Sequence, residues 1–157
     1  HPITSDDARA RIVMNGEIYN YPTLRAELEA RGVAFKTASD TEVALHAWRV
    51  WGQPGMNRLE GMFGLAIWNE REHRLIIARD WLGQKSLYYA ETPLGLVFAS
   101  EIKGLLALGI PSELDLETLS HYMSLRYLPG HRARDRVVRG ALDEPQGFAR
   151  TRVGKHP

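Results

Sequence analysis

The feature that constrains the fold most is an almost unbroken apolar run, GMFGLAIW, at residues 61–68. An apolar run without polar alternation is typical of a strand that is buried on both faces. The polar residues 69–73 predict a turn and residues 74–78 a second strand, so the two strands form a hairpin. Residues 87–90 and 96–99 flank another predicted turn and form a second hairpin. Adjacent hairpins favour antiparallel sheets and an α+β fold over a parallel doubly wound sheet.

Helix signals precede these strands. Pro22 suits the first turn of a helix, where its missing N–H costs nothing. Leu24 and Leu28 lie one turn apart on one face of this predicted helix, and Gly32 is expected to end it. Residues 33–36 are β-prone, and we expect a short strand there.

A second helix is predicted from a capping box. Ser39 is the expected N-cap and Glu42 the expected partner at the third helical position. The helix behind them is expected to end at Gly52. Further helices are predicted at residues 102–108 and 115–125, the latter from a stripe of apolar residues.

Charge is distributed unevenly along the chain. The formal net charge of the 157 residues is +1, but residues 131–157 carry seven basic residues and three acidic ones. This segment has few large apolar residues and no sustained period, so it is poorly suited to a core. We therefore place a boundary near Gly130. The basic residues of the tail favour nucleic-acid binding only weakly, because no recognition motif accompanies them.

Composition excludes several kinds of site. The sequence has no cysteine, which excludes disulfides, cysteine-ligated zinc, iron–sulfur clusters and a thiol nucleophile within these residues. The six histidines are scattered, so we predict no metal site. No apolar run approaches the roughly 20 residues that a membrane-spanning helix needs, so we expect no membrane association. The chain begins with His1-Pro2 and no methionine, which suggests a fragment.

Four stretches together carry a resemblance to a known family. They are VMNGEIYNY at 13–21, SDTEV at 39–43, the block from LEGMFG to EIKGLLA at 59–107, and LDLETLSHYMSLRYLPG at 114–130. In this order and spacing they resemble the glutaminase domain of glutamine-hydrolysing asparagine synthetase, a class II glutamine amidotransferase. The resemblance assigns residues 1–130 to a partial domain of this type. It leaves residues 131–157 as a basic tail without family match, which we expect to be disordered.

The resemblance implies a fold and an activity. The fold is of the N-terminal-nucleophile hydrolase type, with antiparallel sheets sandwiched by helices, here incomplete because the N-terminal strands are missing. Members of the family release ammonia from glutamine by attack of an N-terminal cysteine, whose own amino group is the base. The ammonia then reaches a synthetase domain for ATP-dependent amidation of aspartate. Because this chain has no cysteine, we expect it to be inactive alone.

The resemblance also implies cofactors, partners and a location. No cofactor is expected in the glutaminase domain, whereas ATP and Mg belong to the synthetase domain, which is missing here. Glutamine and the synthetase domain of the parent chain are the expected partners, and the parent is a candidate homodimer. We expect no nucleic-acid partner, no membrane partner and a cytoplasmic location.

Four residues match the family's glutamine site. Asn15 and Gly16 match the oxyanion hole, which needs a side-chain amide and a backbone N–H aimed at one point. From the dipeptide alone, a type I′ hairpin turn is the commoner interpretation. Glu17 and Asp40 match positions that bind the amino-acid end of glutamine, where a carboxylate gives a charge-assisted hydrogen bond. The alternatives are a solvated turn residue for Glu17 and a first-turn acid for Asp40.

The RDxxGxK motif completes the resemblance. Arg79, Asp80, Gly83 and Lys85 form it, and Ser86 stands where the family usually has proline. We assign the motif to structural support or to a domain interface, with Lys85 and Lys103 as candidates for interface contacts. Two other functions stay open: a fragment of another class II amidotransferase, and a non-catalytic remnant.

Overall fold

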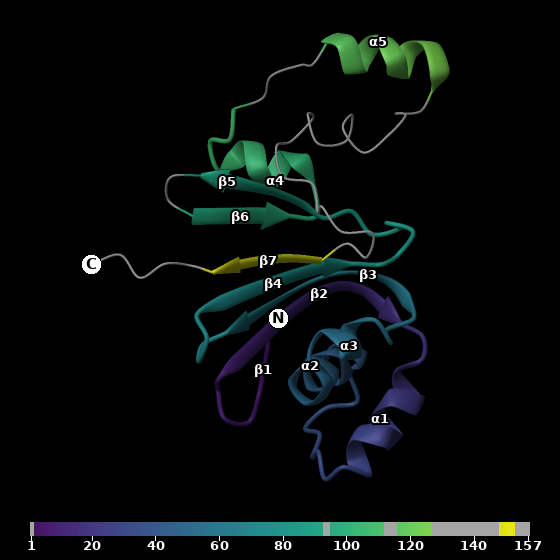
Figure 1. Ribbon diagram of the computed structural model, residues 1–157, viewed down its shortest axis with the longest axis vertical. Coiled ribbons are helices and arrows are strands. Elements are labelled where there is room, and N and C mark those ends of the chain that lie inside the picture. Colours follow the sequence, from purple (N-terminus) through teal and green to yellow (C-terminus); the bar gives the residue numbers. More distant parts are fainter. Residues whose placement is uncertain (1, 93–94, 112–115, 127–147, 153–157) are drawn as a thin grey trace, which may run out of the picture. The chain divides into compact units, whose positions relative to one another are not determined.

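The computed structural model describes residues 2–92, 95–111, 116–126 and 148–152. The chain forms two compact units, one of residues 1–86 and 144–157 and the other of residues 87–143. We call these the first unit and the second unit and describe each by itself (Figure 1). None of the helices within the described ranges has the length and apolar character needed to cross a membrane.

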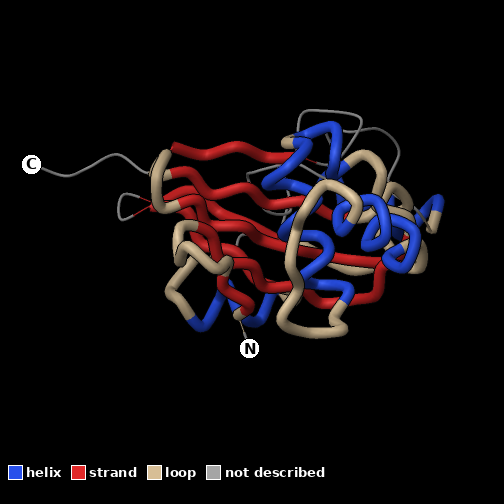
Figure 2. Tube along the Cα trace, turned by 90° about the horizontal axis from the view of Figure 1, so that it is seen from below, coloured by secondary structure: helices blue, strands red, loops and turns tan. Residues whose placement is uncertain are grey.

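The first unit is built on a five-stranded antiparallel sheet. Its strands, in their order across the sheet, are β1 (Ile3–Thr4), β2 (Ala10–Ile18), β3 (Gly61–Asn69), β4 (Arg74–Arg79) and β7 (Phe148–Arg152). Figure 2 shows strands of the chain lying side by side. The hairpin predicted from the apolar run is β3–β4, and residues 63–67 of β3 are all buried, which confirms a strand covered on both faces.

Strands β2 and β3 approach each other unusually closely at one end. Gly16 lies opposite Phe63 and Ile18 opposite Gly61. A Cβ on Gly16, which has φ +138°, would overlap the carbonyl oxygen of Met62, and a Cβ on Gly61 would overlap that of Glu17. Only glycine fits at these two positions, because every other residue would force the strands apart.

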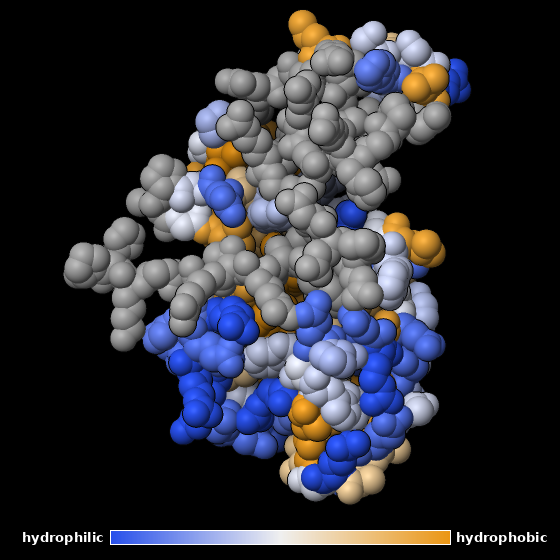
Figure 3. All heavy atoms as spheres, in the orientation of Figure 1, coloured by the Kyte–Doolittle hydropathy of each residue, from blue (hydrophilic) through white to orange (hydrophobic). Residues whose placement is uncertain are grey.

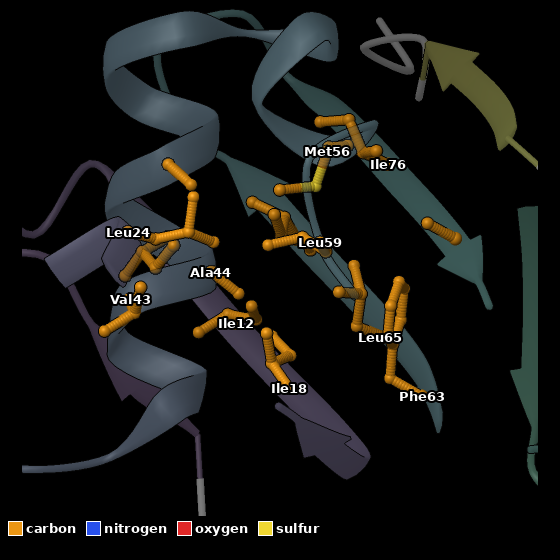
Figure 4. Packing of buried hydrophobic residues seen from close by; sticks show 14 of the residues in the cluster. Ile12, Ile18, Leu24, Val43, Ala44, Met56, Leu59, Phe63, Leu65 and Ile76 are labelled. Atoms are coloured by element: carbon orange, nitrogen blue, oxygen red, sulfur yellow. The ribbon is translucent and has the colours of Figure 1, made fainter. Parts of the chain in front are cut away.

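Helices cover one face of this sheet. They are α1 (Tyr21–Glu29), α2 (Asp40–Trp51) and α3 (Gln53–Met56), and they lie on the same side of β2–β4 (Figure 1). Pro22 lies in the first turn of α1 as predicted, and Gly32 adopts φ +84° just beyond its end. The core lies between the helices and the sheet, with large side chains such as Ile12, Leu24 and Leu65 fully buried (Figure 4).

Two predictions about residues 33–42 are wrong. Residues 33–36 form no strand, and the Glu42 side chain does not complete a capping box with Ser39. Instead the buried Glu42 carboxylate accepts the backbone N–H groups of Lys36 and Thr37 at 2.9 and 2.7 Å. Burial opposes ionisation of Glu42, but these hydrogen bonds outweigh it, so its pKa lies below the ordinary value. The N–H groups of Lys36 and Thr37 are therefore satisfied by a side chain, and that of Val33 by the Leu28 carbonyl oxygen, rather than by strand pairing.

The loop after β4 is organised by one buried carboxylate. Asp80 is 3% exposed and accepts four backbone N–H groups at 2.9–3.3 Å, those of Phe63, Leu82, Gln84 and Lys85. Burial opposes ionisation, but the four donors outweigh it and hold the pKa of Asp80 below its ordinary value. The Arg79 side chain lies against Gly83, where a Cβ would come within 3.3 Å of its guanidinium. The structural role expected for the RDxxGxK motif is therefore evident at Asp80 and Gly83.

The second unit contains the other predicted hairpin and two helices. Strands β5 (Tyr88–Thr92) and β6 (Gly95–Ala99) pair antiparallel, followed by α4 (Ile102–Ala107) and α5 (Leu116–Leu125). The predicted elements are thus present, each within about two residues of its expected bounds. Leu105 of α4 is buried, whereas Met123 of α5 is 73% exposed.

The predicted tail differs from expectation in one segment. Residues 148–152 form β7, which pairs with β4 from Ala78 to Arg74. Residues 127–147 and 153–157 lie outside the described residues. The boundary near Gly130 and the disorder expected for the rest of the tail therefore stay predictions.

Replacing Gly16 by alanine is expected to destabilise the first unit by more than the cost of an unfavourable φ, about 1–3 kcal/mol. The added Cβ would also push β2 away from β3. Gly32→Ala is the matched control, because Gly32 also has a positive φ but a Cβ there meets nothing within 4 Å. Urea denaturation followed by circular dichroism measures both free energies of unfolding. Equal losses in the two variants would contradict the close approach of the strands.

Asp80→Asn is expected to lower the free energy of unfolding at neutral pH by about 1.5–3 kcal/mol. The folded pKa of Asp80 is below its ordinary value of 3.8, which we take for the unfolded chain. The ionised carboxylate therefore stabilises the fold fully above that value, and this contribution disappears as the pH falls through the folded pKa. The variant should accordingly lose less stability than the unsubstituted chain on acidification below about pH 4.

The control for this experiment is Glu29→Gln, which removes an exposed carboxylate on α1. Denaturation at a series of pH values gives the stability profile of each protein. If the free energy of unfolding falls equally with pH in Asp80→Asn and in the unsubstituted chain, Asp80 does not cause this pH dependence.

Candidate active site

Asn15, Gly16 and Glu17 lie inside a continuous strand and not in a turn. They occupy the second half of β2, and each is paired with a residue of β3. The type I′ turn, which is the commoner meaning of Asn-Gly, is therefore wrong here. The glycine is instead required by the close approach of β3.

The alternation of β2 places Asn15 and Glu17 on the face away from the helices. Ala10, Ile12 and Ile18 are buried, and Asn15 and Glu17 are exposed. The structure gives neither of these two side chains a hydrogen bond or ion pair with any other described residue. An amide and a carboxylate two residues apart on one face are thus available to a ligand.

Asp40 joins this strand from the first turn of α2. Ser39 is the N-cap of the helix, and its Oγ accepts the Thr41 N–H at 3.2 Å. The Asp40 Oδ1 accepts the same N–H at 2.7 Å, while Oδ2 accepts the backbone N–H of Ile18 at 2.9 Å. Ile18 directly follows Glu17, so this hydrogen bond brings the carboxylate of Asp40 to the end of β2 that carries the other three predicted residues.

Asp40 occupies a position compatible with both interpretations, and its role in substrate binding stays a prediction. It is a first-turn acid, where the helix dipole favours negative charge, and it lies beside the predicted substrate-binding residues. We call Asn15, Gly16, Glu17 and Asp40 the β2-end site. The Asp40–Ile18 hydrogen bond fixes the helix start relative to the strand, so Asp40 also positions the site.

Sequence reasoning missed the residues that face this site from β3. Gly61, Met62 and Phe63 lie opposite Ile18, Glu17 and Gly16. Gly61 and the Met62 carbonyl define how closely β3 approaches. The only signal in the sequence was the glycine at the start of the apolar run, and an isolated glycine in a strand does indicate close backbone approach.

The described residues contain no group of three or more histidine, cysteine, aspartate or glutamate side chains that could hold a metal ion. Lys85 is half-buried and Lys103 is exposed, and the structure gives neither ammonium group an ion pair with a described residue. Their contribution to a domain interface stays a prediction.

Comparison with known proteins relates this geometry to a family. The family model described as "Glutamine amidotransferase domain" matches residues 1–142. Asparagine synthetase [glutamine-hydrolyzing] 1 of Bacillus subtilis (strain 168) is 44% identical over 128 residues, which are 82% of this chain and 20% of that protein. Asparagine synthetase [glutamine-hydrolyzing] 3 of the same organism is 45% identical over 96 residues, or 61% of this chain and 16% of that protein.

A solved structure is also similar. It is the glutamine phosphoribosylpyrophosphate amidotransferase from B. subtilis, complexed with ADP and GMP. The TM-score is 0.59 at 25% identity, and the match covers 69% of this chain and 26% of that one. The α+β fold of the amidotransferase type is confirmed by this likeness, and the chain spans about a fifth of the length of the curated relatives it matches. The matched family model covers most of the sequence, and this chain belongs to the glutamine amidotransferase domain family.

Proposed function

We propose that this chain forms part of a site that hydrolyses glutamine to release ammonia. The observation that carries the proposal is the hydrogen bond from the Ile18 N–H to Asp40 Oδ2, because it gathers all four residues of the β2-end site. Two carboxylates, Glu17 and Asp40, then flank an exposed amide and a glycine at one strand end. This combination suits a substrate with an ammonium group at one end and a carbonyl at the other.

Each residue has a distinct part in the proposed reaction. Glu17 and Asp40 bind the α-ammonium group of glutamine. The Asn15 Nδ2–H and the Gly16 N–H stabilise the oxyanion that forms when a nucleophile attacks the side-chain amide carbonyl. Collapse of this tetrahedral intermediate expels ammonia and leaves an acyl-enzyme that water hydrolyses to glutamate. The sequence contains no cysteine, so in this proposal the attacking thiol comes from a segment outside it.

The proposed role of the whole protein follows its relatives. Those that match at 44% and 45% identity are named as glutamine-hydrolysing asparagine synthetases. We extend the proposal to a parent protein in which a synthetase domain uses ATP, Mg and the released ammonia to amidate aspartate. Dimerisation of the parent and a cytoplasmic location, where glutamine, aspartate and ATP are abundant, belong to the same proposal.

A parent protein that transfers the ammonia to a different acceptor substrate is the alternative. The similar solved structure is an amidotransferase that acts on phosphoribosylpyrophosphate, so another class II amidotransferase remains an alternative parent. The higher identity to the asparagine synthetases favours aspartate. ATP cleavage by the parent protein that depends on aspartate would single out the first assignment, and cleavage independent of aspartate would reject it.

The proposal is tested by supplying the nucleophile. The N-terminal segment of the B. subtilis asparagine synthetase 1 relative, joined ahead of Pro2, is expected to give a protein that releases ammonia from glutamine. A folded chimera that binds no glutamine would reject the proposed site and favour a non-catalytic remnant. Circular dichroism establishes folding and calorimetry measures glutamine binding.

Glu17→Gln in this chimera is expected to raise KM for glutamine about 10–100-fold, because a hydrogen bond between charged groups is lost. The effect on kcat should be small, since the ammonium group is remote from the reacting carbonyl. Glu29→Gln on α1 is the matched control, and it removes a carboxylate away from the site. Steady-state ammonia release measures both constants, and an unchanged KM for Glu17→Gln would contradict the assignment.

Asn15→Ala is expected to have the complementary effect. Removal of one oxyanion donor typically lowers kcat about 100–1,000-fold, while substrate affinity changes little. Calorimetry with glutamine and single-turnover kinetics separate these two quantities. A loss of affinity without a loss of rate would assign Asn15 to substrate binding and contradict its place in the oxyanion hole.

A further inference from the structure

A pocket of about 380 Å³ lies at the other end of the β2–β3 pair. It is an open pocket, bordered by the turn between β1 and β2, the end of α2, α3, and the turn between β3 and β4. Ala10, which lines it, is paired with Asn69, whereas Gly16 of the β2-end site is paired with Phe63. Six residues of strand separate the two places, or roughly 20 Å. We call it the arginine pocket.

The floor of the arginine pocket is apolar. Met56 and Ile76 are buried and Trp48 is half-buried, and all three line the pocket. Figure 4 shows Met56 and Ile76 in the space between α3 and β4. Helix α3 lies directly against α2. Gly55 permits this contact, because a Cβ at this position would overlap the carbonyl oxygen of Ala47. This contact brings Met56 to the floor, which can receive the apolar body of a small molecule.

The rim is positively charged. Four arginines line the pocket, together with two acidic residues, so the lining has a net charge of +2. Arg49 Nη2 lies 2.8 Å from Asp7 Oδ2, and Arg74 Nη1 lies 3.0 Å from Glu72 Oε2. The other two arginines, Arg9 and Arg71, are exposed and have no ion pair with any described residue. In the space-filling view, hydrophilic residues cover this side of the first unit (Figure 3).

A buried amide in the pocket lining adds an unpaired donor. Asn69 lines the pocket and is only 9% exposed. Its Oδ1 accepts the Arg71 N–H at 3.1 Å, but within the described ranges its Nδ2 has no acceptor. A buried donor without an acceptor costs free energy, and such a group in a native protein calls for a ligand or water that supplies the acceptor. An anionic oxygen would satisfy both this donor and the two unpaired guanidinium groups.

The two turns that carry Arg9 and Arg71 are joined by a backbone hydrogen bond. The Glu70 N–H donates to the carbonyl oxygen of Arg9 at 2.8 Å, across the turns. In the first turn, Asp7 Oδ1 accepts the Ser5 hydroxyl at 2.7 Å and the Arg9 N–H at 3.2 Å. The rim is therefore formed before a ligand arrives, which lowers the entropic cost of binding.

We propose that the arginine pocket binds a small organic anion, with a planar apolar body over Trp48 and Met56 and a carboxylate or phosphate at the rim. The anionic group contacts Arg9 and Arg71 and accepts the Asn69 amide. This site is separate from glutamine hydrolysis and does not depend on the function proposed above.

Calorimetry on the full chain with matched probes tests the ligand class. Indole-3-acetate and AMP each combine a planar body with one of the two anionic groups, and at least one is expected to bind with Kd below about 1 mM. Indole, adenosine, acetate and inorganic phosphate each lack one part and should bind at least about tenfold more weakly. Tighter binding of indole-3-acetate would identify a carboxylate as the preferred anionic group, and tighter binding of AMP a phosphate. Binding of neither, or equal binding of inorganic phosphate, would overturn the proposal.

Variants locate the binding. Arg9→Gln combined with Arg71→Gln should weaken the organic anion at least about tenfold. Arg11→Gln combined with Arg31→Gln removes the same charge outside the pocket lining and should leave the affinity unchanged. Equal losses in both pairs would show an effect of net charge alone and overturn the proposal.

Asn69→Asp tests the buried donor. The substitution keeps the acceptor for the Arg71 N–H but replaces the unpaired donor by a second anionic oxygen, so binding should be abolished. Unchanged binding by a folded Asn69→Asp protein would remove Asn69 from the site. If this variant does not fold, as judged by circular dichroism, the two arginine pairs still decide the proposal.

Discussion

Strands β2 and β3 approach so closely at Gly16 and Gly61 that neither position has room for a Cβ. This contact is reciprocal, because each glycine faces a backbone carbonyl of the opposite strand. It holds Asn15 and Glu17 in a rigid paired strand, on the face that α1–α3 leave uncovered. The orientation of Asn15 and Glu17 therefore depends on backbone packing more than on side-chain contacts.

Three carboxylates hold irregular segments of the first unit in place. Asp40 accepts the Ile18 N–H, and Glu42 accepts the donors of residues 36–37. Asp80 accepts one donor from β3 and three from the loop after β4. In each case an acidic side chain takes the place of a backbone carbonyl as the acceptor. Such charge-assisted bonds are stronger than neutral ones, and they allow irregular segments to pack against the sheet without unpaired donors. The family motif around Asp80 is thus explained by backbone organisation.

The regular elements were predictable wherever local patterns agreed with the tertiary structure. The run at residues 61–68 and the turn that follows it specify a buried hairpin, and both were predicted correctly. The strand prediction for residues 33–36 failed because strand propensity competed with a side-chain acceptor six residues further on, Glu42, which binds the Lys36 N–H. The same side chain fits a capping box in sequence, so the tertiary role of Glu42 contradicts both predictions.

The two sites differ in how much of each the sequence could reveal, and the reason is topological. Asn15, Gly16 and Glu17 are contiguous, so a motif can identify them even though their strand conformation contradicts the usual meaning of Asn-Gly. The arginine pocket is assembled from three segments between residues 7 and 76, none of which carries a motif. Only the antiparallel register, which sets Ala10 opposite Asn69, brings its two turns together. Since that same register aligns Gly16 with Phe63, one strand pairing specifies both ends of the sheet.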